Sequence, residues 1–443
     1  MNTELRGDTP DSNPERLNLK EVIAMGVGGM VGGGIFSVLG LAIAQAGHAA
    51  PIAFAIGGVI ALLTGLSYAR LGLRFQSDGG SFTYLDHAFG HSNIAGIGGW
   101  LLLVGYIGTL ALYAYTFGVY GTAMLGVDEL TREPTQIFLQ ALVLLIFLSI
   151  NLYGVKASGT SELLIVTIKV LILGLFAVIG VFYAKPEYLL PLFNQGELGV
   201  LMGAALIFVA YEGFELIPNT VNEMEQPERN LARGIFWSIG ITMAIYVLVS
   251  IVAVGNLLPD EIQKYGEYAL AEAARPFLGQ AGFLLIGLAA LFSTSSAINA
   301  TLFGTARLSM VMATEHALPR VFSFRRGPSN IPWVSLLIIT GCTIAFVILA
   351  DLTIISSFAS SSFLLVFAAI NLSAWRLRGQ IKCNGITPLV GLVLSLISWI
   401  SLIIYLWNTN QHTLYWIFAI YLLLIVAELL FSQRRLFMRP VRP

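Results

Sequence analysis

The chain has 443 residues, of which 56% are hydrophobic and 11% are charged, and its formal net charge is −1. Soluble domains carry roughly 25% charged residues, so this composition excludes a water-soluble globular domain and predicts that lipid surrounds much of the chain. The lack of excess positive charge argues against a nucleic-acid partner. Cys342 and Cys383 lie in or beside apolar stretches, where we expect small hydrophobic side chains and no disulfide framework.

The first 18 residues are polar and lack the apolar centre of a signal peptide. We expect residues 1–18 to form a disordered cytoplasmic tail. Asn18 is the predicted N-cap of the first helix, because its side chain can accept hydrogen bonds from the first free amides.

Apolar runs long enough to cross a bilayer recur along the whole chain. A transmembrane helix needs about 20 such residues. The sequence therefore predicts an all-α membrane protein with twelve transmembrane helices. They lie near residues 20–46, 51–75, 93–125, 134–153, 160–184, 198–222, 234–257, 277–312, 332–350, 353–376, 387–408 and 412–432.

The connections between these runs alternate in charge. Positive residues mark cytoplasmic connections, and the alternation predicts a multi-pass protein of the cell (inner) membrane with both termini in the cytoplasm, including a basic tail over residues 433–443. The acidic connections contain Asp128, Glu129, Glu133, Asp260, Glu261, Glu267 and Glu272. The positive residues are Arg6, Arg16, Lys20, Arg70, Arg74, Lys156, Arg229, Arg233, Arg320, Arg325, Arg326, Arg376, Arg378, Lys382, Arg434, Arg435, Arg439 and Arg442.

The first run contains six glycines in the nine positions from Gly26 to Gly34. Each glycine disfavours a helix by about 1 kcal/mol relative to alanine, and broken backbone is not tolerated against lipid. We therefore predict an interrupted helix that lines a cavity walled by protein. Close helix packing through small residues, which Gly28 and Gly32 would suit, is the alternative.

The sixth run is also unusual, because Glu212, Gly213 and Glu215 stand near its middle and Pro218 follows. Broken helices one and six, five apart, predict an inverted repeat of five helices over residues 19–184 and 198–378, followed by two helices over 387–432. Half-helix N-termini suit a carboxylate, and freed carbonyls suit an ammonium or a cation. A site with both would bind a zwitterion.

Lys169 is the one charge near the centre of the fifth run, and an ionisable residue at this depth is a candidate functional group. Burial disfavours the charged form of a lysine, so we expect it to exchange a proton during a cycle. A static ion pair with Glu212 or Glu215 is the alternative. The eighth run adds mid-span polar groups that favour a cation or ammonium site, unless they bond to their own helix. These are Ser293, Thr294, Ser295, Ser296 and Asn299.

Six motifs together are specific: residues 28–36, 78–82, 169–174, 211–214 and 292–300, and Glu223 with Pro227 and Arg229. With them the sequence resembles the amino acid–polyamine–organocation (APC) family, and within it the proton-coupled amino-acid transporters of broad specificity. The resemblance extends from about Leu19 to the last run.

The resemblance implies a binding site for an amino acid and a proton, with no cofactor and no metal ion. The substrate carboxylate would lie on the backbone amides of Gly32, Gly33 and Gly34, and its amino group would meet the carbonyls of Met30, Val209 and Glu212, beside Gly213. Lys169 matches the position where sodium-coupled relatives hold a sodium ion, and its expected contacts are the Gly28 carbonyl and the Ser293 hydroxyl. The carboxyl of Glu212 departs from the family pattern, which more often has a neutral residue there.

These features support a secondary active amino-acid transporter that works by proton symport and alternating access. A polyamine or cationic amino-acid carrier or exchanger, in which Glu212 reads the substrate charge, is the main alternative. Transport of an inorganic cation such as potassium, and a nutrient sensor that binds without transporting, also remain open. A membrane enzyme is disfavoured, because the five histidines show no metal-ligand spacing. Nothing in the sequence sets the oligomeric state.

Overall fold

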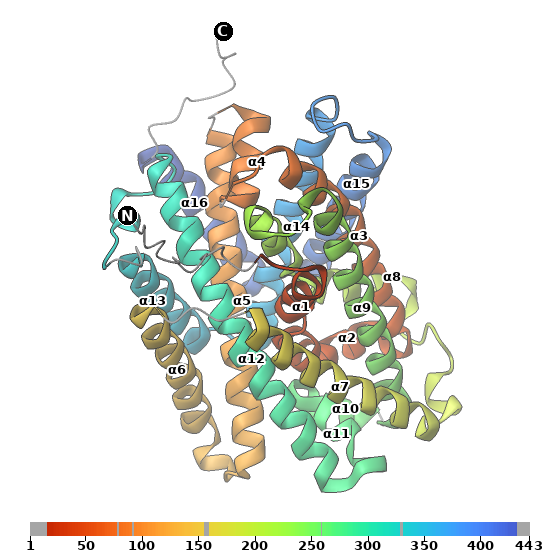
Figure 1. The fold of residues 1–443 in the computed structure, drawn as a ribbon. Coiled ribbons are helices and arrows are strands. Elements are labelled where there is room, and N and C mark those ends of the chain that lie inside the picture. Colours follow the sequence, from red (N-terminus) through yellow and green to blue (C-terminus); the bar gives the residue numbers. More distant parts are fainter. Residues whose placement is uncertain are drawn as a thin grey trace, which may run out of the picture.

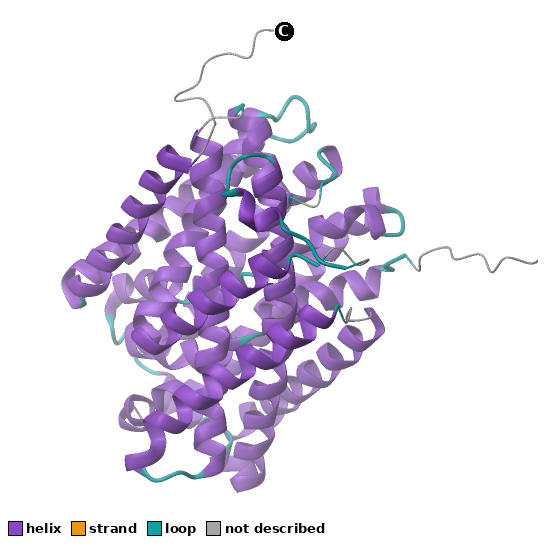
Figure 2. Cartoon of the chain, turned by 90° about the vertical axis from the view of Figure 1, so that its left-hand side faces the viewer, coloured by secondary structure: helices purple, strands orange, loops and turns teal. Residues whose placement is uncertain are grey.

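The computed structural model describes residues 16–77, 79–90, 93–154, 159–257, 259–327 and 331–431. This part of the chain is almost entirely helical, as Figure 2 shows. Most of the predicted N-terminal tail, Asp78, Lys156 and the basic tail over residues 433–443 lie outside the described residues.

The first five predicted spans are all helical (Figure 1). The first span comprises three consecutive elements, and the next four are single helices. In chain order they are α1 (Leu19–Met30), η1 (Gly34–Val38) and α2 (Leu39–Ala46), then α3 (Ala50–Arg74), α5 (Asn93–Leu125), α6 (Glu129–Tyr153) and α7 (Gly159–Tyr183). The short elements between them are η2 (Gly47–Ala49), α4 (Gly80–Phe89) and η3 (Pro186–Leu189).

The remaining seven spans follow the same plan, with the sixth again divided into three elements. They are α8 (Gly196–Leu206) with η4 (Phe208–Tyr211) and η5 (Phe214–Glu223), then α9 (Pro227–Asn256), α12 (Arg275–Thr314), α13 (Trp333–Leu349), α14 (Leu352–Arg376), α15 (Ile386–Thr409) and α16 (Gln411–Phe431). The short elements are α10 (Pro259–Tyr265), η6 (Gly266–Tyr268), α11 (Ala269–Ala273) and η7 (Arg320–Ser323).

Nine helical stretches in the described residues are long and apolar enough to cross a membrane, and the bent pair formed by α8 and η4–η5 raises this to ten. The stretch Leu19–Arg74 contains two predicted spans, which Gly47 divides with its φ of 58°. The predicted ninth span, α13, is apolar but has only 17 residues. The predicted all-α membrane architecture is confirmed for the described residues.

The chain enters the first span through a capping box. The Asn18 side chain accepts from the amides of Lys20 and Glu21 at 2.9 and 3.2 Å, and the Glu21 carboxylate accepts from the Asn18 amide at 2.9 Å. Just before it, Leu17 pairs with the backbone of Glu223 and Glu225. The predicted cap is therefore present, and the start of the first span lies beside the end of the sixth.

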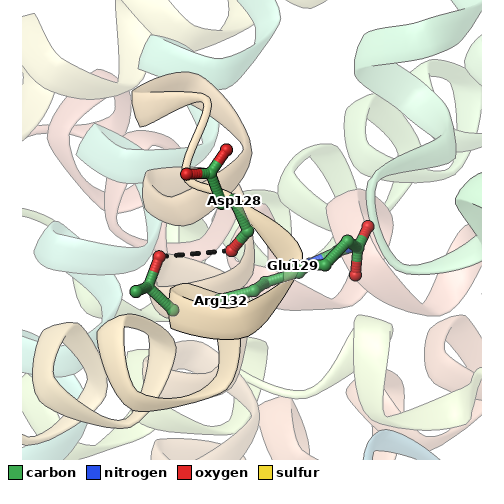
Figure 3. Close-up of polar contacts among 4 residues, drawn as sticks. Asp128, Glu129 and Arg132 are labelled. Atoms are coloured by element: carbon green, nitrogen blue, oxygen red, sulfur yellow. Dashed lines mark hydrogen bonds and ion pairs between the residues drawn. The ribbon is translucent and has the colours of Figure 1, made fainter.

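The connection between α5 and α6 is one of those predicted to be acidic, and Figure 3 shows the first turn of α6. The Thr131 hydroxyl donates to the Asp128 carbonyl at 3.2 Å, and Arg132 lies 3.6 Å from the Glu129 carboxylate. Because the Glu129 side chain is 90% exposed, this ion pair contributes little to stability.

The two divided spans lie at the centre of the bundle. Residues 26–40 and 203–215 are buried throughout. α1 packs against α7 and α9, while η1 contacts η4. In contrast, the last helix exposes large apolar side chains such as Leu422 and Leu430, which suits contact with lipid. The fold thus surrounds both broken spans with protein, as broken backbone in a bilayer requires.

Candidate functional site

The first break is a tight turn between α1 and η1. Val31 has φ −77° and ψ 72°, and the Gly32 amide donates to the Met30 carbonyl at 2.8 Å, which is the geometry of an inverse γ-turn. In a continuous helix the amides of residues 32–35 would bond the carbonyls of residues 28–31. The turn redirects the chain, so these four carbonyls need other donors.

Lys169 of α7 supplies two of these bonds. Its Nζ donates to the Gly28 carbonyl at 2.9 Å and to the Val31 carbonyl at 2.8 Å, and the residue is only 1% exposed. The Ser293 hydroxyl of α12 also donates to the Val31 carbonyl. Lys169 and Ser293 therefore meet at one carbonyl in the break, and the lysine reaches Gly28 as the resemblance implied.

Tyrosines supply the other two bonds. Tyr113 of α5 donates to the Gly29 carbonyl at 3.1 Å. Tyr246 of α9 lies 2.6 Å from the Met30 carbonyl and 2.9 Å from the Ala210 carbonyl of the second break. A tyrosine hydroxyl has one proton to donate, so Tyr246 can fully satisfy only one of the two breaks at a time.

The second break begins where α8 ends at Leu206. The Ser360 hydroxyl of α14 donates to the Leu206 carbonyl at 2.8 Å and accepts from the Val209 amide at 3.0 Å. Glu212 is extended, and Gly213 has φ 124°, which side chains other than glycine rarely tolerate. The two halves of the span bend by 49°. The predicted interruption of the sixth helix is present.

The two breaks touch each other through glycines. A Cβ atom on Gly213 would lie 2.5 Å from the Gly29 carbonyl carbon, and one on Gly34 would lie 2.6 Å from the Ala210 Cα. Gly32 approaches the Tyr113 ring in the same way, at 2.6 Å. The glycine run therefore both breaks the helix and permits close packing, so the two readings of the sequence coexist.

Two carboxyl groups lie in the second break, and their surroundings differ. Glu215 accepts from the Gly213 amide at 2.8 Å and from the Tyr106 hydroxyl at 3.2 Å. Glu212 is 1% exposed, and neither of its oxygens has a hydrogen-bond partner in the described part of the chain. Lys169, for which the sequence left open an ion pair with Glu212 or Glu215, donates to the carbonyls of Gly28 and Val31.

Some polar side chains of the eighth span bond to the first break, as a cation or ammonium site would require, and others bond within their own helix. Ser293 reaches the first break, whereas the Thr294 hydroxyl donates to the Ala290 carbonyl of its own helix at 2.8 Å. Asn299 accepts from Asn151 of α6 at 2.9 Å, which joins two helices away from the breaks.

The fold brings the predicted site residues into one region. One group is Met30, Gly32, Gly33, Gly34, Val209, Glu212 and Gly213, and the other is Lys169, Gly28 and Ser293. The Gly32 amide is already engaged by the Met30 carbonyl. Gly33 and Gly34 open the resumed helix, where the first amides have no acceptor within the helix.

Sequence analysis missed Tyr246, although its hydroxyl binds carbonyls of both breaks. A single tyrosine in an apolar span carries only a weak signal, since it usually serves packing. Ser360 belongs to the serine-rich stretch 356–362, for which the sequence left lining of the pathway and ordinary packing open. Thr116 was also missed; its hydroxyl donates to Leu112 at 2.8 Å and lies 3.4 Å from the Gly33 carbonyl.

Comparison with known proteins agrees with this architecture. A family model described as amino acid permease matches residues 17–438. The chain is 34% identical over 422 residues to an uncharacterized protein of Methanocaldococcus jannaschii, covering 95% of this chain and 96% of that protein. It is 29% identical over 437 residues to the inner membrane transport protein YbaT of Escherichia coli, covering 98% and 99% of the two chains.

Two more distant matches extend the picture. Vacuolar cationic amino acid transporter 8 of Arabidopsis thaliana is 26% identical over 397 residues, covering 86% of this chain and 66% of the transporter. A solved mutant manganese transporter of Eremococcus coleocola superposes with a TM-score of 0.55 over 95% of both chains. At 12% identity this structural likeness supports the fold alone. From the family match, the relatives and the two broken helices, the chain belongs to the amino acid permease family and is a multi-pass membrane transporter, not an enzyme.

Proposed function

We propose that this protein is a secondary active amino-acid transporter that couples uptake to protons by alternating access. The observation that carries the proposal is the pair of hydrogen bonds from Lys169 to Gly28 and Val31, at 2.9 and 2.8 Å. They place a titratable cation across the first break. Loss of one proton from Lys169 would weaken both bonds together and so alter the packing of the broken helix.

The substrate would bind between the two breaks. Its carboxylate would lie on the amides of Gly33 and Gly34, with Gly32 joining if its γ-turn opens. Its ammonium would donate hydrogen bonds to the carbonyls of Met30, Val209 and Glu212, beside Gly213. Because Tyr246 now donates to the Met30 carbonyl, the incoming ammonium would replace that hydroxyl, which could still donate to Ala210.

The proton would act on the opposite side of the first span. Protonated Lys169 would hold α1 against α7 and, through the shared Val31 carbonyl, bring Ser293 of α12 into the same contact. Release of the proton toward the cytoplasm would loosen this joint and let the helices of the two broken spans rock together. Substrate and proton would thus be bound in one conformation and released in the other.

The location and topology belong to the same proposal. We place the protein in a prokaryotic inner membrane with both termini in the cytoplasm, in line with its basic connections and with the inner-membrane relative. Residues 19–184 and 198–378 would be the two inverted repeats, and residues 387–432 would be additional helices.

Reconstituted protein tests the proposal directly. Proteoliposomes with an imposed inward proton gradient should accumulate a labelled amino acid above its external concentration, and a protonophore should abolish the accumulation. The substrate can be found first by thermal-shift screening, because ligand binding raises apparent stability. Binding without accumulation would indicate a sensor. Uptake of potassium that amino acids do not inhibit would indicate the inorganic-cation alternative.

A second candidate is a carrier or exchanger of polyamines or cationic amino acids. It is favoured by the Glu212 carboxyl, which has no hydrogen-bond partner among the described residues and lies beside the proposed ammonium site, and by the relative named as a cationic amino acid transporter. A binding screen on the wild type and on Glu212→Gln would separate the candidates, because only a site for cations should lose selectivity.

A further inference from the structure

Glu212 occupies an unusual position for an acidic residue. It lies at the hinge between η4 and η5 with φ −69° and ψ 145°, and it is 1% exposed. Neither carboxyl oxygen finds a hydrogen-bond donor among the described residues. An ionised carboxylate in such surroundings would lose its hydration without compensation, which is strongly unfavourable.

Glu215, three residues further along the chain, has two hydrogen-bond donors. The Gly213 amide and the Tyr106 hydroxyl both donate to it, and these bonds favour its ionised form. Two buried carboxylates three residues apart repel each other, so the pair is expected to hold at least one proton. The difference in donors assigns that proton to Glu212.

The other groups around Glu212 do not change this assignment. The polar side chains near the second break bond to other groups. They are Tyr68 with Ser81, Tyr106 to Glu215, Thr109 to the Gly105 carbonyl, Tyr113 to the Gly29 carbonyl, Tyr246 to the Met30 and Ala210 carbonyls, and Ser360 to the Leu206 carbonyl. Tyrosines stay neutral between pH 5 and pH 8, so they do not compensate a charge on Glu212. Lys169 donates to the carbonyls of Gly28 and Val31 in the first break.

We propose that Glu212 carries a proton when the substrate is neutral and gives it up when the substrate brings its own positive charge. This inference rests on the proposed transport of amino acids and deepens it, because it defines which substrates the site accepts. A neutral amino acid would bind beside the uncharged carboxyl. A cationic side chain would bind beside the carboxylate and supply the partner that the described residues do not.

The charge balance gives a measurable consequence. The substrate-free carrier keeps a proton on Glu212. With a neutral substrate this proton crosses with the loaded carrier and returns with the empty one, so Glu212 adds no net charge. A cationic substrate displaces the proton on the side where it binds, and Glu212 takes up a proton again on the side of release, so one proton returns for each positive charge that the substrate brings. Any proton carried by Lys169 is common to both. The two classes should therefore move equal charge per molecule, although the cationic substrate sends one proton in the opposite direction.

L-Lysine and L-norleucine form a matched pair, because lysine is norleucine with a terminal ammonium group. Wild-type proteoliposomes would be tested for each with labelled flux and reversal potential, between pH 5 and pH 8. We expect equal charge per molecule, with lysine favoured as pH rises and norleucine favoured as pH falls. One additional elementary charge per lysine, or transport of only one of the two, would overturn the inference. No uphill uptake of either would instead refute the proposed function.

Variants sharpen the test. Glu212→Gln cannot ionise, so the ratio of lysine to norleucine uptake should fall at least tenfold. The charge per norleucine should stay the same, and the charge per lysine should rise by one. Glu428 of α16 offers a matched control, since it is also fully buried and accepts a bond from Asn93 at 3.3 Å away from the breaks. Glu428→Gln should keep the wild-type charge ratio. An unchanged uptake ratio in Glu212→Gln would contradict the assignment, and the wild-type comparison decides the matter if this variant does not fold.

Discussion

The two hydrogen bonds from Lys169 to the first break allow the free energy of proton coupling to be estimated. A hydrogen bond from a charged group contributes about 1.5–3 kcal/mol, and a neutral one contributes about 0.5–1.5 kcal/mol. Lys169 makes two such bonds, to Gly28 and Val31. Losing its proton should therefore weaken the joint by roughly 2–3 kcal/mol, which shifts a conformational equilibrium by roughly 30–150-fold. That is enough to drive a change between binding and release.

Two substitutions of Lys169 separate its two proposed roles, which are donating hydrogen bonds to the first break and releasing a proton. Lys169→Ala removes both bonds and leaves the Gly28 carbonyl without its side-chain donor, which should lower the stability by about 1–3 kcal/mol. The Val31 carbonyl still accepts a hydrogen bond from the Ser293 hydroxyl. Lys169→Arg retains donors but stays charged in proteins. We expect the alanine variant to lose uptake driven by a pH gradient. The arginine variant should bind substrate yet fail to accumulate it.

Proteoliposome uptake under an imposed pH gradient measures the coupling, and thermal shift on the same preparations measures binding. A single symmetric elution peak would show that each variant is folded. Full uphill uptake by Lys169→Ala, or wild-type uptake that does not respond to the gradient, would refute the reasoning. Equal accumulation by Lys169→Arg and the wild type would show that the lysine acts as a fixed charge.

Three other predictions follow from the geometry of the breaks. Gly213→Ala should reduce uptake at least tenfold, because its φ of 124° and the 2.5 Å approach to Gly29 exclude a Cβ, whereas Gly341→Ala in open space should behave as wild type. Tyr246→Phe should lower the unfolding temperature without substrate and enlarge the substrate-induced thermal shift, since the ammonium would then supply the missing donor; an unchanged shift would argue against competition at Met30. Gly40→Ala would place a Cβ 2.0 Å from the Gly266 carbonyl, so it should displace η6 and increase hydrogen exchange there. Wild-type protection of η6 in that variant would contradict this packing.

Local sequence patterns predicted much of the architecture. Long apolar runs predicted the spans because a helix in lipid must satisfy its backbone internally. The Asn18 cap followed from hydrogen bonds within three residues of one another. Gly213 and the glycines from Gly28 to Gly34 predicted both breaks, since a helix is weakest where side chains contribute least to it.

The partners of the breaks could not be read in the same way. Lys169 lies 141 residues from Gly28 along the chain, and Tyr246 lies 216 residues from Met30. Nothing local distinguishes Tyr246 or Ser360 from ordinary packing residues. Nothing local shows that Tyr106 donates to Glu215 while Glu212 has no hydrogen-bond partner among the described residues. The amino-acid order settles where the backbone stops being helical, because that depends on near neighbours. Which groups then satisfy the freed carbonyls, and which carboxyl must keep its proton, depends on helices that only folding brings together.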